Sequence, residues 1–129
     1  MDIVEDKQIP EFKLIVAGGR DFNRYHSVAH EITMLANQEL KDYAVSIVSG
    51  MARGADRMAW EFAQKAHAQC YEFPADWDTH GKAAGHIRNR EMAEFADGLL
   101  AFWDGQSRGT KNMIETMRAM GKPVRDIRY

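Results

Sequence analysis

Short apolar runs alternate with amphipathic stretches along most of this chain. The runs that predict strands lie at 12–22, 43–50, 69–73, 98–105 and 122–129. We expect the last of these strands at an edge of the sheet, because Pro123 donates no ladder hydrogen bond. The amphipathic stretches, in which apolar residues recur every three or four positions, lie at 24–39, 55–66, 83–95 and 110–120 and predict helices. We expect a loop over 75–82. Strands that alternate with helices indicate parallel βαβ units.

This alternation predicts an α/β fold, a Rossmann-like three-layer sandwich with a mainly parallel sheet of about five strands. A chain of 129 residues fits one domain, and no repeat or linker interrupts the pattern. We therefore expect a polar N-terminal leader over 1–11 and a single domain over 12–129.

The composition, 45% hydrophobic and 28% charged, is that of an ordinary globular protein. The leader lacks the apolar region of a signal peptide, and no run approaches the roughly 20 residues of a membrane span. The single cysteine, Cys70, cannot form an internal disulfide, so we expect a cytoplasmic protein without membrane contact. The net charge of −2 gives no general attraction to a phosphate backbone, so we expect nucleic acid not to be among its partners.

Three loops that follow strands are rich in glycine, and each carries an arginine. They are AGGRDF (17–22), SGMARGAD (49–56) and DGQSRGTK (104–111). In a parallel sheet such loops share the carboxyl edge, where ligands bind. Glycine-rich turns free backbone N–H groups at the positive end of the next helix, and arginine adds a forked donor that suits phosphate. Any one loop could be only a tight connection, but three at one edge predict a phosphate-bearing ligand.

A fourth stretch, FPADWDTHGKAAGHIRNREMA (73–93), follows the third strand and reaches the same edge. Trp77 could stack on a base, and Lys82 and Arg88 could contact phosphate, although a solvated helix with a buried tryptophan is the plainer interpretation. No loop has the G-x-G-x-x-G pattern followed by an acid, or ends in Gly-Lys-Ser/Thr, which disfavours a common dehydrogenase or a P-loop ATPase. His26 and His30 lack a third ligand, so we expect neither a metal nor a cofactor.

The candidate binding residues all lie in these loops. They are Gly18, Gly19, Arg20, Asp21, Ser49, Gly50, Ala52, Arg53, Gly54, Asp56, Trp77, Lys82, Arg88, Asp104, Gly105, Ser107, Arg108, Gly109 and Thr110. Among them, Asp56 and Asp104 could accept hydrogen bonds from ribose hydroxyls. Asp56, Asp104 and Arg88 are the candidates for a catalytic role, and whether the protein is an enzyme is left open.

Four motifs, GGRDF, SGMARGADRMA, FPADWDTHGKAAGHIRNREM and FWDGQSRGTKNMI, resemble the YspA/YpsA-related group of the SLOG superfamily over residues 12–125. The resemblance implies a Rossmann-like fold that binds nucleotides or nucleotide-derived ligands such as ADP-ribose, in a protein of bacterial or phage origin. Because relatives often form dimers, it also implies a homodimer or higher homo-oligomer.

Two relatives in that superfamily imply different activities. The Lonely-Guy phosphoribohydrolases imply an N-glycosidic hydrolase or transferase acting on nucleoside monophosphates, and Arg88, Met92, Gly109 and Thr110 match their motifs. Their catalytic glutamate, however, corresponds to Met113 here. Glu115 comes two residues later, about 200° around a helix, and is expected to point away. The DNA-processing protein A family, which shares SGMARGAD, implies a single-stranded nucleic-acid accessory protein. Our main expectation is that the protein binds a nucleotide or a nucleotide-derived ligand. Glycosidic cleavage and a single-stranded nucleic-acid accessory role are the alternatives.

Overall fold

The computed structural model describes residues 9–129, so most of the expected leader lies outside the described residues. The strands are β1 (Glu11–Gly18), β2 (Ala44–Ser49), β3 (Cys70–Glu72), β4 (Gly98–Trp103) and β5 (Val124–Arg128). The helices are α1 (Tyr25–Asn37), α2 (Ala55–Ala66), α3 (Trp77–His80), the 3-10 turn η1 (Gly81–Ala83), α4 (Ala84–Phe95) and α5 (Arg108–Ala119).

The five strands form one sheet in the order β3-β2-β1-β4-β5, and every neighbouring pair is parallel. The prediction of a Rossmann-like α/β fold with about five strands is confirmed, and β5 lies at an edge as expected. The strand order reverses beside β1, which pairs with β2 on one side and with β4 on the other. In open sheets of this kind, ligands bind outside the carboxyl ends of the strands at such a reversal.

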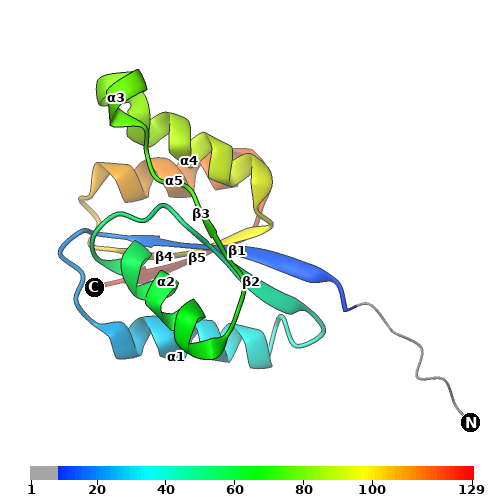
Figure 1. The fold of residues 1–129 in the computed structure, drawn as a ribbon. Coiled ribbons are helices and arrows are strands. Elements are labelled where there is room, and N and C mark those ends of the chain that lie inside the picture. Colours follow the sequence, from blue (N-terminus) through cyan, green and yellow to red (C-terminus); the bar gives the residue numbers. More distant parts are fainter. Residues whose placement is uncertain (1–8) are drawn as a thin grey trace, which may run out of the picture.

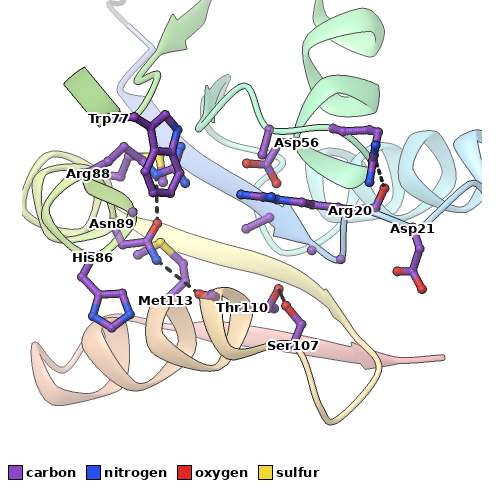
Figure 2. Close-up of a pocket in the computed structure, with 18 of the residues that line it drawn as sticks. Arg20, Asp21, Asp56, Trp77, His86, Arg88, Asn89, Ser107, Thr110 and Met113 are labelled. Atoms are coloured by element: carbon purple, nitrogen blue, oxygen red, sulfur yellow. Dashed lines mark hydrogen bonds between the residues drawn. The ribbon is translucent and has the colours of Figure 1, made fainter. Parts of the chain in front are cut away.

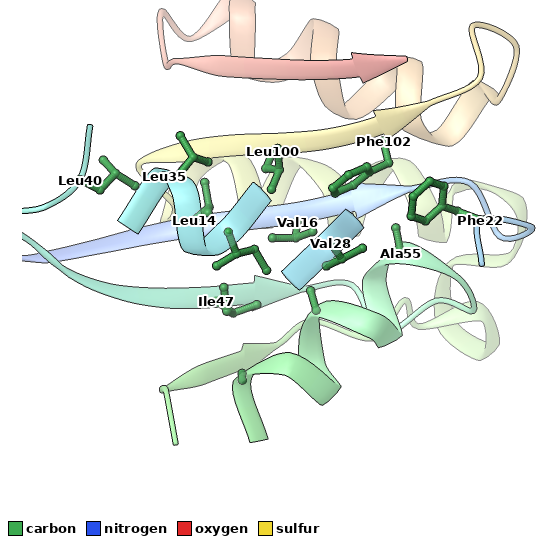
Figure 3. Close-up of a cluster of buried hydrophobic side chains, with 13 residues drawn as sticks. Leu14, Val16, Phe22, Val28, Leu35, Leu40, Ile47, Ala55, Leu100 and Phe102 are labelled. Atoms are coloured by element: carbon green, nitrogen blue, oxygen red, sulfur yellow. The ribbon is translucent and has the colours of Figure 1, made fainter. Parts of the chain in front are cut away.

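Helices cover both faces of the sheet (Figure 1), with α1 and α2 on one face and α4 and α5 on the other. Successive side chains of β1 point to opposite faces of the sheet, as they do in any β-strand. Leu14 and Val16 join the cluster beneath α1 and α2 (Figure 3), whereas Ile15 and Ala17 join the cluster beneath α4 and α5. This double burial explains why residues 14–18 of the strand form an uninterrupted apolar run.

Most elements differ from their expected boundaries by a few residues, and two of the differences concern the cavity side of the sheet. The segment 75–82, expected as a loop, contains α3 and the start of η1. Asp76 caps α3, because its Oδ1 accepts the Thr79 N–H at 3.1 Å, and a helix of four residues is too short to show periodicity in the sequence. The last helix, α5, begins at Arg108, two residues before the expected start at Thr110.

Among residues 9–129, no helix combines the length and the apolar character needed to cross a membrane.

Candidate functional site

A cavity of about 450 Å³ lies at the carboxyl ends of the strands (Figure 2), where the strand order reverses. Its lining includes residues from all the loops singled out in the sequence. The expected residues that line it are Gly18, Gly19, Arg20, Asp21, Ala52, Arg53, Asp56, Trp77, Lys82, Arg88, Ser107, Gly109 and Thr110. The sheet therefore brings together expected residues that are up to 92 positions apart in the chain, from Gly18 to Thr110.

The other expected residues, Ser49, Gly50, Gly54, Asp104, Gly105 and Arg108, do not line this cavity. Two of them shape its loops instead. Ser49 Oγ donates to the Asp56 carbonyl oxygen at 2.8 Å and accepts the Met51 N–H at 3.1 Å, which closes the turn between β2 and α2. Asp104 Oδ1 accepts the N–H groups of Gln106 and Ser107, both at 2.8 Å, and these bonds lower the pKa of Asp104. Asp104 thus fixes the loop that leads into α5.

Several lining residues were not among the sequence candidates: Ala17, Gly85, His86, Asn89, Met92 and Met113. His86 and Asn89 lie in the stretch 73–93, whose density of polar residues was the available signal. Met92 and Met113 are each 1% exposed and belong to the core beneath α4 and α5. Their helical spacing indicates only burial, and the available signal that they border the cavity was their match to positions of the Lonely-Guy motifs.

Asp56 lies in the first turn of α2 and is buried, with only 5% of its surface exposed. Burial raises the pKa of its carboxyl to about 6. The positive charge of Arg88 and the backbone N–H groups of Ala52 and Gly18 act in the opposite direction and favour the carboxylate. Asp56 therefore presents an acceptor inside a cavity whose other charged groups are mostly cationic.

Arg88, on α4, is held by several hydrogen bonds. Its Nη1 donates to the Gly50 carbonyl oxygen at 2.6 Å, and its Nε donates to Asn89 Oδ1 at 3.0 Å. Asn89 Nδ2 in turn donates to the Gly109 carbonyl oxygen at 3.2 Å and to Asn112 Oδ1 at 3.0 Å. This network fixes the guanidinium against the β2–α2 loop and joins α4 to the first turns of α5.

Arg20 extends its side chain into the cavity beside Asp56 (Figure 2). Arg53 Nε donates to the Arg20 carbonyl oxygen at 3.4 Å, which links the first and second loops. Within residues 9–129, no hydrogen bond or ion pair involves the Arg20 guanidinium. Burial and, in smaller measure, the charge of Arg20 lower the pKa of Arg88. The guanidinium groups of Arg20 and Arg88 therefore lie close enough to repel each other, and an anion bound between them would be favoured.

The N-terminus of α5 opens onto the same cavity. The side chain of Ser107, the residue before the helix, does not cap it, and Ser107 Oγ lies 3.2 Å from Thr110 Oγ1 instead. A Cβ atom added to Gly109 would meet nothing within 4 Å. Free backbone N–H groups, two hydroxyls and open space make this helix end suitable for an anion.

Trp77 lies at the mouth of the cavity and is 51% exposed, so the interpretation of a buried tryptophan is wrong. Its indole makes no hydrogen bond with any other residue of the described range 9–129. An exposed aromatic face beside cationic groups suits stacking on a planar base.

The position that corresponds to a catalytic glutamate in the Lonely-Guy resemblance holds Met113, whose thioether carries no charge. Glu115 is exposed and does not line the cavity. Within residues 9–129, the lining carboxylates are those of Asp56 and Asp21, and Asp21 accepts the Tyr129 hydroxyl at 3.1 Å.

Comparisons with known proteins identify a sequence family and solved structures with the same fold. The sequence model of the YspA, cpYpsA-related SLOG family matches residues 12–80. The Gene 61 protein of Mycobacterium phage D29 is 42% identical over 88 residues, which cover 64% of this chain and 70% of that protein.

Two solved structures share the fold. DNA processing protein A from Streptococcus pneumoniae matches 89% of this chain and 50% of its own, with a TM-score of 0.72 and 20% identity. DNA processing protein A from Helicobacter pylori matches 89% of this chain and 64% of its own, with a TM-score of 0.61 and 22% identity. The match thus spans half to two thirds of those proteins, and at this identity the likeness shows the fold alone.

The expectation that nucleic acid is not among the partners is wrong. The Helicobacter pylori structure, which has this fold, is described by its single-stranded DNA binding mode. A net charge of −2 averages over the whole chain and conceals the local excess of arginine and lysine around the cavity.

Proposed function

The chain belongs to the YspA, cpYpsA-related SLOG family, and on that premise we propose that its cavity binds a nucleotide or a nucleotide-derived ligand such as ADP-ribose. The observation that carries the proposal is that three arginines, an open helix N-terminus and an exposed tryptophan meet around one cavity. Guanidinium and N–H groups suit phosphate, the carboxylate of Asp56 suits ribose hydroxyls, and the Trp77 indole suits a base.

The number of donors is sufficient for useful affinity. A hydrogen bond to a charged group contributes about 1.5–3 kcal/mol, and a micromolar ligand requires about 8 kcal/mol. One such bond from each of Arg20, Arg53 and Arg88, with up to about 2 kcal/mol from the α5 N-terminus, gives a range of about 4.5–11 kcal/mol that includes this requirement.

A nucleotide panel tests the proposal. Thermal unfolding of the purified protein is followed with AMP, ADP, NAD and ADP-ribose, and mass spectrometry identifies any small molecule released on denaturation. We expect at least one of these ligands to raise the unfolding temperature. The proposal fails if none does and no nucleotide derivative is released.

Arg20→Gln is the sharpest variant, because the Arg20 guanidinium projects into the cavity and the fold does not use it. We expect it to weaken binding at least tenfold while the unfolding temperature without ligand stays the same. Arg118→Gln is the matched control, since Arg118 lies exposed on α5 and does not line the cavity.

Single-stranded nucleic acid is a second candidate ligand, supported by the fold shared with the Helicobacter pylori protein and by the arginines around the cavity. Fluorescence anisotropy with a labelled single-stranded oligonucleotide tests it. Binding through phosphate should weaken steeply between about 50 and 200 mM salt. Absence of binding at the lower salt concentration eliminates this candidate.

Glycosidic cleavage is a less favoured candidate, because Met113 provides no carboxylate where the Lonely-Guy resemblance implies one. Asp56 is the buried carboxyl that borders the cavity. Release of free base from nucleoside monophosphates, abolished by Asp56→Asn, would establish cleavage.

A further inference from the structure

A tyrosine outside the cavity contacts one of the loops that form it. Tyr129 follows β5, and its hydroxyl donates to Asp21 Oδ1 at 3.1 Å across 108 positions of the chain. Arg20 and Asp21 line the cavity at the carboxyl ends of the strands, whereas Tyr129 does not. The hydrogen bond therefore reaches the site from outside its wall.

The place of Tyr129 is fixed by contacts that do not involve Asp21. Its backbone N–H donates to the Trp103 carbonyl oxygen at 3.3 Å, which continues the pairing of β5 with β4. Its ring lies edge-on against the buried Phe22, with 4.7 Å between the ring centroids. Partial burial and the hydrogen bond to Asp21 raise the pKa of Tyr129 to about 12, so the hydroxyl keeps its proton at neutral pH and remains a donor.

The Asp21 carboxylate is exposed, and Figure 2 shows it turned away from the Arg20 side chain, which extends into the cavity. Within residues 9–129, Asp21 forms no ion pair, and the Tyr129 hydroxyl is the one group that donates a hydrogen bond to its side chain. Consecutive Cα atoms lie only about 3.8 Å apart, so a released Asp21 carboxylate could turn onto the guanidinium of the preceding residue. Such a pair would occupy the cation that the site offers to phosphate.

Gly19 leaves the space that this contact needs. A Cβ atom at position 19 would overlap the Tyr129 hydroxyl and would lie 2.8 Å from Asp21 Oδ1. The first glycine-rich loop can therefore approach the end of β5 only because this residue has no side chain.

We propose that Tyr129 is a positioning residue of the site, whose hydroxyl holds the Asp21 carboxylate away from Arg20 and so keeps the Arg20 guanidinium available for an anion. The inference rests on the proposed phosphate-binding function and adds to it a residue that lies outside the cavity. The alternative is a purely structural role, in which the Tyr129 ring packs on Phe22 and has no effect on Arg20.

Tyr129→Phe separates the two roles, because it removes the hydroxyl and keeps the ring on Phe22. We expect this variant to bind ADP about fivefold more weakly in calorimetric titration at low salt, because the ligand must first break an exposed pair between Asp21 and Arg20. In the Asp21→Asn background, the same removal of the hydroxyl should leave the affinity for ADP unchanged, since no carboxylate is released.

Tyr43→Phe is the matched control. Tyr43 also lies edge-on against a phenylalanine, Phe12, with 5.5 Å between the ring centroids. It precedes β2, at the opposite end of the sheet, and does not line the cavity. The affinity of this variant for ADP should equal that of the unaltered protein.

The reactivity of Arg20 tests the inference without any ligand. Phenylglyoxal modifies accessible guanidinium groups, and mass spectrometry of peptides measures the rate at each arginine. Modification of Arg20 should be slower in Tyr129→Phe than in the unaltered protein, and adding Asp21→Asn should restore the original rate. Arg24, whose charge also acts on Tyr129, is followed in the same experiment.

An unchanged rate at Arg20 in Tyr129→Phe, or a slower rate at Arg24 alone, would overturn the inference. An equal loss of ADP affinity with and without the Asp21 carboxylate would show a purely structural role and would also overturn it. Failure of the unaltered protein to bind ADP would count against the proposed function, while the rates at Arg20 would still decide whether Tyr129 holds Asp21 away from it.

Discussion

At the scale of single residues, Gly54 is a position where the fold does not tolerate a side chain. Its φ of +91° and ψ of −134° lie in a region that is almost restricted to glycine. An added Cβ atom would overlap the Gly19 carbonyl oxygen, because the first two loops touch there. We expect Gly54→Ala to lower the free energy of unfolding by about 3 kcal/mol, measured by urea denaturation.

Gly109→Ala is the matched control for this change. Its Cβ atom would meet nothing within 4 Å, and alanine is the better helix former. The free energy of unfolding should stay the same or rise by at most about 1 kcal/mol. A stability loss as large as that of Gly54→Ala would show that other atoms already occupy the space beside Gly109 at the start of α5.

Asp56 makes stability depend on pH. Burial raises the pKa of its carboxyl in the folded protein from 3.8 to about 6, so between about pH 4 and pH 6 the folded state keeps a proton that the unfolded chain has released. Stability from this group is therefore present below pH 4 and is lost as the pH rises through 6. A shift of about two units corresponds to about 3 kcal/mol.

Asp56→Asn removes this titration. The free energy of unfolding of the unaltered protein, minus that of the variant, should decrease by about 3 kcal/mol from pH 4 to pH 7. Taking the difference cancels the opposite trend of other carboxyls, such as Asp76 and Asp104, whose pKa values are lowered. A difference that is constant with pH would contradict the raised pKa.

At the scale of elements, Asn89 joins α4 to α5 and also orients Arg88. Asn89→Ala removes three hydrogen bonds in a buried place and leaves the Arg88 Nε and the Gly109 carbonyl oxygen without these partners. We expect it to lower the free energy of unfolding by about 2 kcal/mol and to weaken ligand binding. Chemical denaturation and the nucleotide titration measure the two effects.

Arg90→Ala, one position further along α4, is the control for Asn89→Ala. The Arg90 side chain is 71% exposed and pairs with Glu94 on the surface, so its loss should cost less than about 1 kcal/mol. If both variants lose the same stability, the buried network does not stabilise the α4–α5 contact.

The elements also show how far the sequence could predict this molecule. Strand and helix periodicity located β1 to β5 and the longer helices, and α2 begins and ends as expected at Ala55 and Ala66. Parallel strands bring their following loops to one edge, so most candidate residues could be named in advance. Periodicity could not single out Asn89 and Met113, because the packing of α4 against α5 decides which side of each helix borders the cavity.

At the scale of the whole molecule, the sheet order predicts a gradient of local stability. β1, β2 and β4 have a neighbouring strand on both sides, although the outer neighbour of β2 is β3, an edge strand of only three residues, and β5 is the other edge strand. Amide hydrogens in β1 and β4 should exchange most slowly, because their release requires opening of the core. Hydrogen–deuterium exchange followed by mass spectrometry measures this order, and slower exchange in β3 than in β1 would contradict it.

The close approach of Arg88 to Gly50 has a consequence for how relatives of this chain can diverge. A Cβ atom at position 50 would lie 2.5 Å from Arg88 Nη1 and 2.8 Å from Asp56 Oδ2. A side chain at position 50 would therefore displace the Arg88 guanidinium or the Asp56 carboxyl from its present place. In an evolving lineage position 50 should therefore vary together with position 88 or 56, and a homologue that lacks the glycine is expected to present different groups to its ligand.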